Sequence, residues 1–311
     1  MSKHTLPAGG SPESSLTLSA AQVQGRRGYR YVLLDVFTAT PFAGNPLAVF
    51  PDAAALTDIQ MAQLAKELNL SESVFITTRL PGRVALRIFT PSGELPFAGH
   101  PSVGTAWLIR ALGWHDPATP LILAEGVGDV PIRFAGTQAW LTTAQPLDVS
   151  EDSLSIEQAA EILGLSRAQI ATRPVRASCG VPYQLIELAD LDSLASVQVE
   201  SGTLARALPA PAERNLYLYV RNTSQQLRAR MFTAETTLYE DPATGSAAAP
   251  LIGHLSRQMP ATQMLDWQVT QGVEMGRPSH IHGRVSRAEV VQETIQIGGE
   301  AIIAGEGVLY V

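Results

Sequence analysis

A single glutamate stands where a helical pattern gives way to an apolar strand, in the stretch "NLSESVF". Glu72 lies between Ser71 and Ser73 there, and a glutamate in such a place is usually a solvated cap. The alternative is a carboxyl partly shielded from water, whose pKa rises towards the working pH. Such a group can take a proton from carbon and return it at another position. We therefore expect Glu72 to be catalytic and Ser71 to contact the substrate.

A histidine and an aspartate could assist this chemistry. His100 follows Gly99 in "PFAGHPS", and Asp241 precedes Pro242 in "DPATGS". Taken singly, the histidine fits an ordinary hydrogen-bonded structural residue and the aspartate fits the start of an Asx turn. If a cleft brings the two segments together, Asp241 can fix the tautomer and charge of His100, and both can bind polar groups of a substrate. We expect both to take part in catalysis.

The same two segments place glycines at the start of expected helices. A helix N-terminus offers unpaired N–H groups and roughly half a positive charge, and glycine lets a ligand approach the backbone closely. "FAGHPSVG" and "PATGSAAA" therefore predict two cradles for carboxylate or phosphate groups, although each also fits an ordinary helix start. The residues expected to bind substrate in the cradles are Gly99, Thr244, Gly245 and Ser246.

Other chemistry-bearing residues lack the neighbours that their chemistry needs. His280 and His282 in "HIH" have no carboxylate or cysteine at metal-ligand spacing, so we expect no metal site. A Gly-x-Gly-x-x-Gly unit between a strand and a helix is absent, so nothing supports a dinucleotide-dependent oxidoreductase. Cys179 has no flanking nucleophile motif and is expected to be a structural thiol. Arg277 and Ser279 belong either to a surface hairpin or to the wall of the cleft.

Charge and composition narrow the class of protein. The 311 residues carry a formal net charge of −7, without a Lys/Arg block, which argues against a nucleic-acid partner. One cysteine excludes an internal disulfide and suits a reducing compartment, so we expect a cytoplasmic protein. No apolar run approaches the roughly 18–20 residues that cross a bilayer, so no membrane partner is expected. Residues 1–28 are rich in Ser, Gly and Ala, and we expect them to form a disordered tail.

Periodicity places the main elements along the chain. The folded part is expected to begin with the strand "YRYVLLDVF", and residues 56–70 are predicted to form a helix. The apolar residues at helical spacing in that helix are Leu56, Ile59, Leu64, Ala65 and Leu68. Two strands then precede a helix in "PSVGTAWLIRALGW", with proline at its first turn. From about residue 145 a capped helix, "SIEQAAEILGLS", opens a new series of strands, which encloses the small-residue helix after "DPATGS".

The two parts of the chain mirror one another. Each has a strand ending in Phe-Thr, a loop and a Gly-rich entry to an Ala-containing helix, and the pairs Phe89-Thr90 and Phe232-Thr233 lie about 143 residues apart. Strict βαβ alternation is absent. The pattern therefore favours an internally duplicated α+β protein with a cleft between its halves over a single doubly wound sheet.

Five segments resemble, in order and spacing, the signature segments of the phenazine-biosynthesis PhzF-like family: "LDVFTATPFAGNPLAVF", "ELNLSESVF", "RIFTPSGELPFAGHPSVGTAW", "FTAETTLYEDPATGSAAA" and "QGVEMGRPS". The resemblance implies a fold similar to diaminopimelate epimerase, with two pseudo-symmetric domains, each a β-barrel-like sheet around a central helix. It implies a homodimer that needs no cofactor or metal. By the family pattern, residues 29–143 plus 299–311 form the first domain and residues 144–298 the second.

The resemblance also implies roles for particular residues. The fold relatives use a cysteine from each half as a pair of bases, but neither "PFAGHP" nor "DPATGS" contains one. In the PhzF-like family the glutamate is the single proton carrier, which falls on Glu72. Substrate binding and proton handling fall on His100 and Asp241. The implied cradle positions are Gly99, Gly245 and Ser246.

A single base removes and returns a proton on the same face of a substrate, which suits an allylic shift better than inversion at one carbon. The sequence therefore predicts a cofactor-independent isomerase that moves a proton on a small unsaturated or cyclic carboxylic acid. One alternative is a non-catalytic metabolite- or partner-binding protein on the same fold. Another is a hydrolase that uses Ser246 with His100 and Asp241, although no Gly-x-Ser-x-Gly elbow is present.

Overall fold

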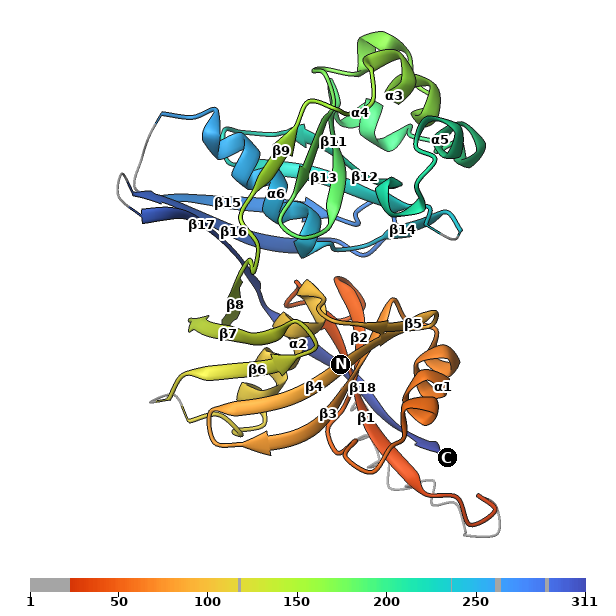
Figure 1. Ribbon diagram of the computed structural model, residues 1–311, viewed down its shortest axis with the longest axis vertical. Coiled ribbons are helices and arrows are strands. Elements are labelled where there is room, and N and C mark those ends of the chain that lie inside the picture. Colours follow the sequence, from red (N-terminus) through yellow and green to blue (C-terminus); the bar gives the residue numbers. More distant parts are fainter. Residues whose placement is uncertain (1–22, 117–118, 236, 261–263, 289–290) are drawn as a thin grey trace, which may run out of the picture.

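The computed structural model describes residues 23–116, 119–235, 237–260, 264–288 and 291–311. Two halves lie one above the other along the long axis of the molecule (Figure 1). Of the predicted tail, residues 1–22 lie outside the described residues, whereas the backbone of Arg27 exchanges hydrogen bonds with that of Val311. Within the described residues, no helix combines the length and apolar character needed to cross a membrane.

The first half is a sheet wrapped around one helix. Neighbouring strands follow the order β18-β1-β2-β3-β4-β6-β7-β8, and β5 pairs with β4. Its elements are β1 (Gly28–Val36), β2 (Asn45–Phe50), α1 (Asp58–Leu68), β3 (Glu72–Leu80), β4 (Arg83–Thr90), β5 (Gly93–Leu95), α2 (Gly99–Ala111), β6 (Leu121–Glu125), β7 (Gly128–Ala135), β8 (Gln138–Thr142) and β18 (Ala301–Tyr310).

The second half repeats this plan. Its strands follow the order β9-β10-β11-β12-β13-β15-β16-β17, and β14 pairs with β13. Its elements are β9 (Asp148–Ser150), α3 (Ile156–Leu163), the 3-10 turn η1 (Arg167–Gln169), β10 (Val175–Ser178), β11 (Pro182–Glu187), α4 (Leu191–Ala195), α5 (Ser201–Ala207), η2 (Pro211–Glu213), β12 (Asn215–Arg221), β13 (Gln226–Thr233), β14 (Tyr239–Asp241), α6 (Gly245–Arg257), β15 (Met264–Gln271), β16 (Ser279–Ala288) and β17 (Val291–Gly299).

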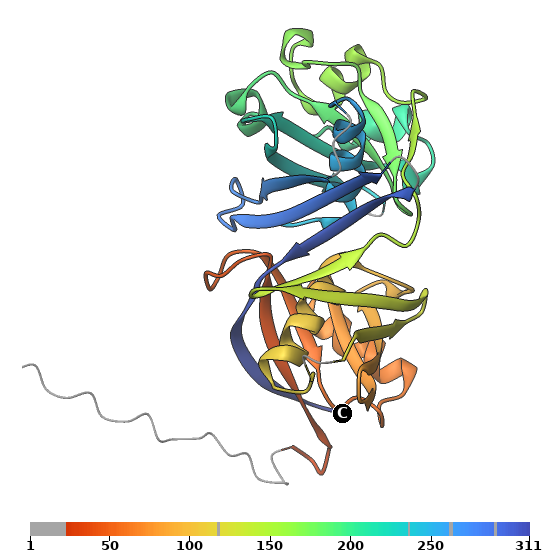
Figure 2. The same ribbon diagram turned by 90° about the vertical axis from the view of Figure 1, so that its left-hand side faces the viewer.

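Strand register confirms the two pseudo-symmetric halves and the α+β class. Ser73 of β3 pairs with Phe89, and Leu216 of β12 pairs with Phe232. The chain passes between the halves after β8 and again from β17 to β18 (Figure 2). Strand β17 pairs with both β16 and β8, so it joins the two sheets. The exact domain limits at residues 143/144 and 298/299 stay a prediction.

The helices α2 and α6 are buried on nearly every side, as expected for a helix at the centre of a sheet that curls around it. Small residues let the sheet approach. A Cβ atom on Gly104 would lie 2.6 Å from a Val36 methyl group, and one on Gly253 would lie 2.5 Å from a methyl group of Ile295. These close contacts prevent each central helix from rotating about its axis, and they therefore hold the residues at its N-terminus in place.

The outer helices follow their local sequence with one exception. Helix α3 has the expected serine cap, Ser155, and ends at Gly164 in the left-handed region (φ 65). In α1, Thr57 forms a capping box with Gln60. Of the apolar residues at helical spacing, Ile59 does not face the sheet, because its side chain is 71% exposed. The stripe that faces the sheet consists of Met61, Leu64 and Ala65.

Candidate active site

Glu72 is the first residue of β3, just after the turn that ends α1. That turn holds Asn69 in the left-handed region (φ 51), which stops the helix and redirects the chain. The Glu72 side chain is 17% exposed, and its Oε2 atom lies 3.6 Å from Nε2 of His100. Both atoms are buried without a hydrogen-bond partner among the described residues. Unpaired buried polar atoms are costly, so their presence marks a place where another molecule can bind.

Burial sets the protonation of this pair. It raises the pKa of Glu72 to about 8, the charge of Asp241 adds to the rise, and a hydrogen bond with Ser71 opposes it. Burial lowers the pKa of His100 to about 3. Near neutral pH the carboxyl therefore holds its proton and the imidazole is uncharged, so their 3.6 Å contact is not an ion pair. A carboxyl that titrates near neutral pH can both accept and return a proton.

The two central helices point their N-termini at each other. Gly99 and His100 open α2, whereas Gly245 and Ser246 open α6, and neither N-cap residue makes a side-chain cap hydrogen bond. A Cβ atom on Gly99 would lie 3.6 Å from the backbone nitrogen of Ser246. Two positive helix ends that meet in this way favour an anion between or beside them.

Asp241 ends β14 and receives hydrogen bonds from both halves. Its Oδ1 atom accepts from Nδ2 of Asn45 at 2.9 Å, and its Oδ2 atom accepts from the Thr244 hydroxyl. Burial raises the pKa of Asp241 to about 6, against the opposing effect of these two donors. The Oδ1 atom of Asn45 accepts from the Ser71 hydroxyl at 3.2 Å. Asn45 thus links Asp241 in the second half to the residue beside Glu72 in the first.

The structure places all the predicted site residues in one cluster where the halves meet. They are Ser71, Glu72, Gly99, His100, Asp241, Thr244, Gly245 and Ser246.

One expected pairing, and the arrangement required by one alternative function, are absent from the described residues. Asp241 makes no hydrogen bond to His100, which faces Glu72 instead. The Ser246 hydroxyl is paired with the phenol of Tyr183 at 2.7 Å, so it does not form the serine–histidine–aspartate arrangement of a hydrolase.

Three residues of the cluster were not predicted, because their role depends on contacts across the fold. Asn45 lies in the stretch "AGNP", whose glycine and proline are typical of a turn, and nothing in that stretch indicates its distant partner. Tyr183 reaches Ser246 from β11, and Gln271 reaches Thr244 from the end of β15. Gln271 follows Leu265, Trp267 and Val269 at alternate positions of β15, and a polar residue on this otherwise apolar face of the strand was the local signal available.

Arg277 and Ser279 belong to the wall between the halves, as one of the two interpretations had it. The Arg277 guanidinium contacts Asp35 at 2.5 Å and donates to the Gly44 carbonyl at 2.8 Å. The Ser279 hydroxyl donates to the carbonyl of Pro242 at 2.9 Å. Both residues therefore fix the turn that leads into β2 against the segment that follows Asp241.

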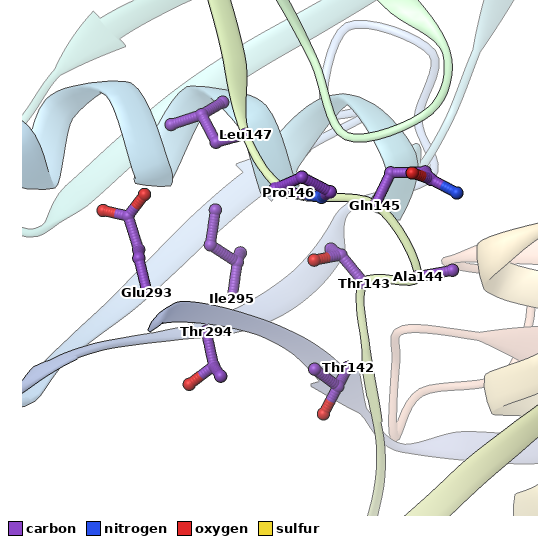
Figure 3. A pocket seen from close by; sticks show the side chains of 9 residues that line it. All are labelled: Thr142, Thr143, Ala144, Gln145, Pro146, Leu147, Glu293, Thr294 and Ile295. Atoms are coloured by element: carbon purple, nitrogen blue, oxygen red, sulfur yellow. The ribbon is translucent and has the colours of Figure 1, made fainter. Parts of the chain in front are cut away.

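Two cavities are lined by none of the residues of this cluster. The cavity in Figure 3, of about 180 Å³, lies between the crossover segment 142–147 and residues 293–295 of β17. The other, of about 220 Å³, is lined in part by His280, His282 and Glu300. In the described part of the chain, no group of three or more His, Cys, Asp or Glu side chains is arranged to hold a metal ion. Cys179 is half-buried, and burial raises the pKa of its thiol to about 12.

Comparison with known proteins yields one consistent family. The model of the PhzC-PhzF family, described as phenazine biosynthesis-like protein, matches residues 34–307. An uncharacterised isomerase of Pasteurella multocida is 37% identical over 285 residues, which cover 91% of this chain and 94% of the relative. The trans-2,3-dihydro-3-hydroxyanthranilate isomerase of Pseudomonas aeruginosa is 34% identical over 289 residues, which cover 91% and 99%.

A solved structure shows the same fold. The PhzF-family phenazine biosynthesis protein of Bacillus anthracis superposes with a TM-score of 0.83 at 20% identity, covering 92% of this chain and 100% of that one.

Proposed function

Because the chain belongs to the phenazine biosynthesis-like (PhzC-PhzF) family and is an isomerase, we propose that it moves a proton on a small unsaturated or cyclic carboxylic acid, with Glu72 as the proton carrier and without a cofactor. One observation carries this proposal. The Glu72 carboxyl is shielded from water, titrates near neutral pH and presents an unpaired oxygen 3.6 Å from an uncharged histidine.

The substrate carboxylate binds at the facing N-termini of α2 and α6. The Ser246 hydroxyl can accept a hydrogen bond from Tyr183 and donate its own proton to that carboxylate. Each helix end contributes about 0.3–2 kcal/mol to the binding of an anion. This interaction orients the acid beside Glu72, and orientation together with exclusion of water lowers the barrier further.

The reaction has two proton transfers. The ionised Glu72 removes a proton from a carbon next to a double bond, and the electron pair of that C–H bond forms a new double bond as the old one shifts. The protonated Glu72 then returns the proton at the far end of the shifted system, so the product is an isomer and the Glu72 carboxylate is restored. His100 bonds a polar substituent of the acid as a neutral donor or acceptor.

The name of the Pseudomonas relative narrows the substrate class. That enzyme isomerises a dihydro-hydroxyanthranilate, and at 34% identity over nearly the whole chain we take a hydroxylated, partly unsaturated ring acid as the class for this protein. The homodimer and the division at residues 143/144 and 298/299 are parts of the same proposal. Light scattering tests the homodimer, and limited proteolysis tests the division into domains.

Isotope exchange tests the function directly. We expect the enzyme, incubated in D₂O with candidate ring acids such as trans-2,3-dihydro-3-hydroxyanthranilate, to place deuterium at carbon in the recovered acid, as read by mass spectrometry and NMR. Binding of such acids with neither a shifted double bond nor deuterium above background would support the non-catalytic alternative and overturn the proposal.

A further inference from the structure

Glu125 is a buried carboxyl that the proposed reaction does not use. It ends β6, is 8% exposed, and lies against the first turn of α2, where its Oε1 atom is 2.7 Å from the Ser102 hydroxyl. Its Oε2 atom is buried and has no hydrogen-bond partner among the described residues. The same turn of α2 carries His100, so this carboxyl contacts the helix two residues away from a residue of the candidate active site.

The hydrogen bonds around Ser102 define where the protons are. The Ser102 hydroxyl lies 2.7 Å from Glu125 and 2.8 Å from the carbonyl oxygen of Ala98, and it has one proton to donate. If Glu125 were ionised, one of these two short contacts would have no proton, and a carboxylate oxygen would lie buried and unpaired. If Glu125 is an acid, it donates to Ser102 and Ser102 donates to Ala98. The protonated form satisfies both contacts.

The second half provides an uncharged counterpart. In the first half β4 pairs with β6, with Arg83 opposite Ile122, and in the second half β13 pairs with β15, with Gln226 opposite Gln268. Glu125 follows Ile122 at the same spacing as Gln271 follows Gln268. The two residues therefore occupy equivalent positions at the ends of β6 and β15. Each precedes a glycine that packs against a proline. A Cβ atom on Gly126 would lie 2.9 Å from Pro96, and one on Gly272 would lie 2.6 Å from the Pro242 carbonyl. The sequence shows the repeat as "EGV" and "QGV".

Gln271 uses its full hydrogen-bonding capacity at the N-terminus of α6. Its amide nitrogen donates to the Asp241 carbonyl at 2.7 Å and to the Thr244 hydroxyl at 3.0 Å. Its amide oxygen accepts from the Tyr217 hydroxyl at 3.0 Å and from the Thr244 backbone N–H at 3.2 Å. A neutral donor thus holds the start of the second central helix in place.

We infer that Glu125 is a positioning residue that acts as a neutral carboxylic acid, holding the N-terminus of α2 through Ser102 as Gln271 holds that of α6. A neutral side chain leaves the positive helix end available to the anionic substrate, whereas a buried carboxylate would compete for it. In the described part of the chain, burial raises the pKa of Glu125 to about 8, Ser102 opposes the shift, and no charged neighbour contributes. The link to substrate rests on the proposed function.

Thermal unfolding of E125Q against pH tests the protonation without any substrate. Glu125 has to keep its proton on folding, so its contribution to stability is complete below its ordinary pKa of 4.5 and declines as the pH rises to about 8. Glutamine has no such dependence. We expect the Tm of E125Q minus that of the parent to increase from pH 5 to pH 9, by about 3 °C or more. A difference that is flat or decreases overturns the inference, as does an E125Q chain that fails to fold.

A matched control removes a carboxyl that forms an ion pair, in contrast to the neutral carboxyl proposed for Glu125. The Glu187 side chain is 13% exposed and is ion-paired with Arg221 at 2.8 Å. Since E187Q loses an ion pair, its Tm at pH 8–9 should fall below that of the parent. On the unsubstituted protein, the ¹³C carboxyl signal that is absent from E125Q should titrate above pH 7, and titration near pH 4.5 contradicts a neutral Glu125.

Isotope exchange then connects this residue to turnover. We expect E125A to lower kcat/KM by about 100-fold, since a displacement of about 1 Å at a reacting group has that effect, and E125Q to recover most of the loss. Equal losses in E125A and E125Q would overturn the positioning role. If the parent enzyme neither isomerises the candidate acids nor exchanges their protons, the proposed function fails, while the thermal and NMR measurements still decide the state of Glu125.

Discussion

Replacing Glu72 with glutamine removes the proposed proton carrier and little else. The two side chains have nearly the same shape, and the Oε2 atom of Glu72 has no hydrogen-bond partner to lose among the described residues. Positioned acid–base catalysis is worth about 10²–10⁴-fold in rate. We therefore expect E72Q to lose deuterium incorporation by at least about 10²-fold, while its affinity for a competing aromatic carboxylate such as benzoate stays within about threefold of the parent.

The same substitution has a second, independent signature in stability. The pKa of Glu72 rises from 4.5 to about 8 on folding, and each tenfold change in proton affinity corresponds to about 1.4 kcal/mol. Folding therefore becomes less favourable by several kcal/mol as the pH rises from 4.5 through 8, because the buried carboxyl has to retain its proton. Glutamine is free of this cost. The Tm of E72Q should exceed that of the parent by several degrees at pH 8–9, and the difference should shrink towards pH 5.

The pH dependence of turnover completes the test. Glu72 has to be ionised to remove a proton, so kcat/KM should rise about tenfold per pH unit and level off near pH 8. Near-parental isotope exchange by E72Q would refute the assignment of the proton carrier. A Tm difference that does not change with pH would refute the reasoning about burial even if exchange were lost.

Three further substitutions address the neighbours of Glu72. The charge of Asp241 contributes to the high pKa of Glu72. In D241N, the rise of kcat/KM with pH should therefore occur at lower pH than in the parent, as measured on the remaining activity. A rise at the same pH would contradict this coupling. N45D replaces the amide that donates to Asp241 at 2.9 Å with a second carboxylate. The Tm of N45D near neutral pH should therefore fall several degrees below that of the parent. A Tm equal to the parent's would show that the amide donor contributes nothing to stability. Y183F removes the phenol that orients Ser246 and should raise KM about tenfold with kcat nearly unchanged, as steady-state kinetics would show; a loss confined to kcat would place Tyr183 in the chemical step instead.

The parts of this fold that depend on neighbouring residues could be predicted from the sequence. Ser155 and Gly164 bound α3 because a cap and a left-handed exit are decided within one helical turn. The Gly-rich entries to α2 and α6 could be recognised for the same reason. Ile59 shows the limit of this approach, because helical spacing cannot say which of two adjoining stripes faces the sheet.

The contacts that assemble the site could not be predicted in this way. Asn45 and Asp241 are separated by 196 positions, and they meet because the halves close against one another. Likewise, the pKa of Glu72 depends on its burial and on the charge of Asp241 from the other half, and no local pattern measures either effect. The sequence could therefore name the groups that we propose to carry the chemistry, but it could not identify the amide and phenol groups that contact them.

The duplicated fold explains why one base is expected to act alone. By register, the position equivalent to Glu72 at the start of β3 is Asn215 at the start of β12, and the position equivalent to His100 in α2 is Ser246 in α6. Inversion at one carbon needs a second proton carrier on the opposite side of the substrate, and pseudo-symmetry would place it at these equivalent positions. Neither an amide nor a serine hydroxyl titrates there near neutral pH. At the two positions equivalent to Glu72 and His100, the second half provides only neutral hydrogen-bonding groups, so in the proposed reaction a proton removed by Glu72 is returned by Glu72 to the same face of the substrate.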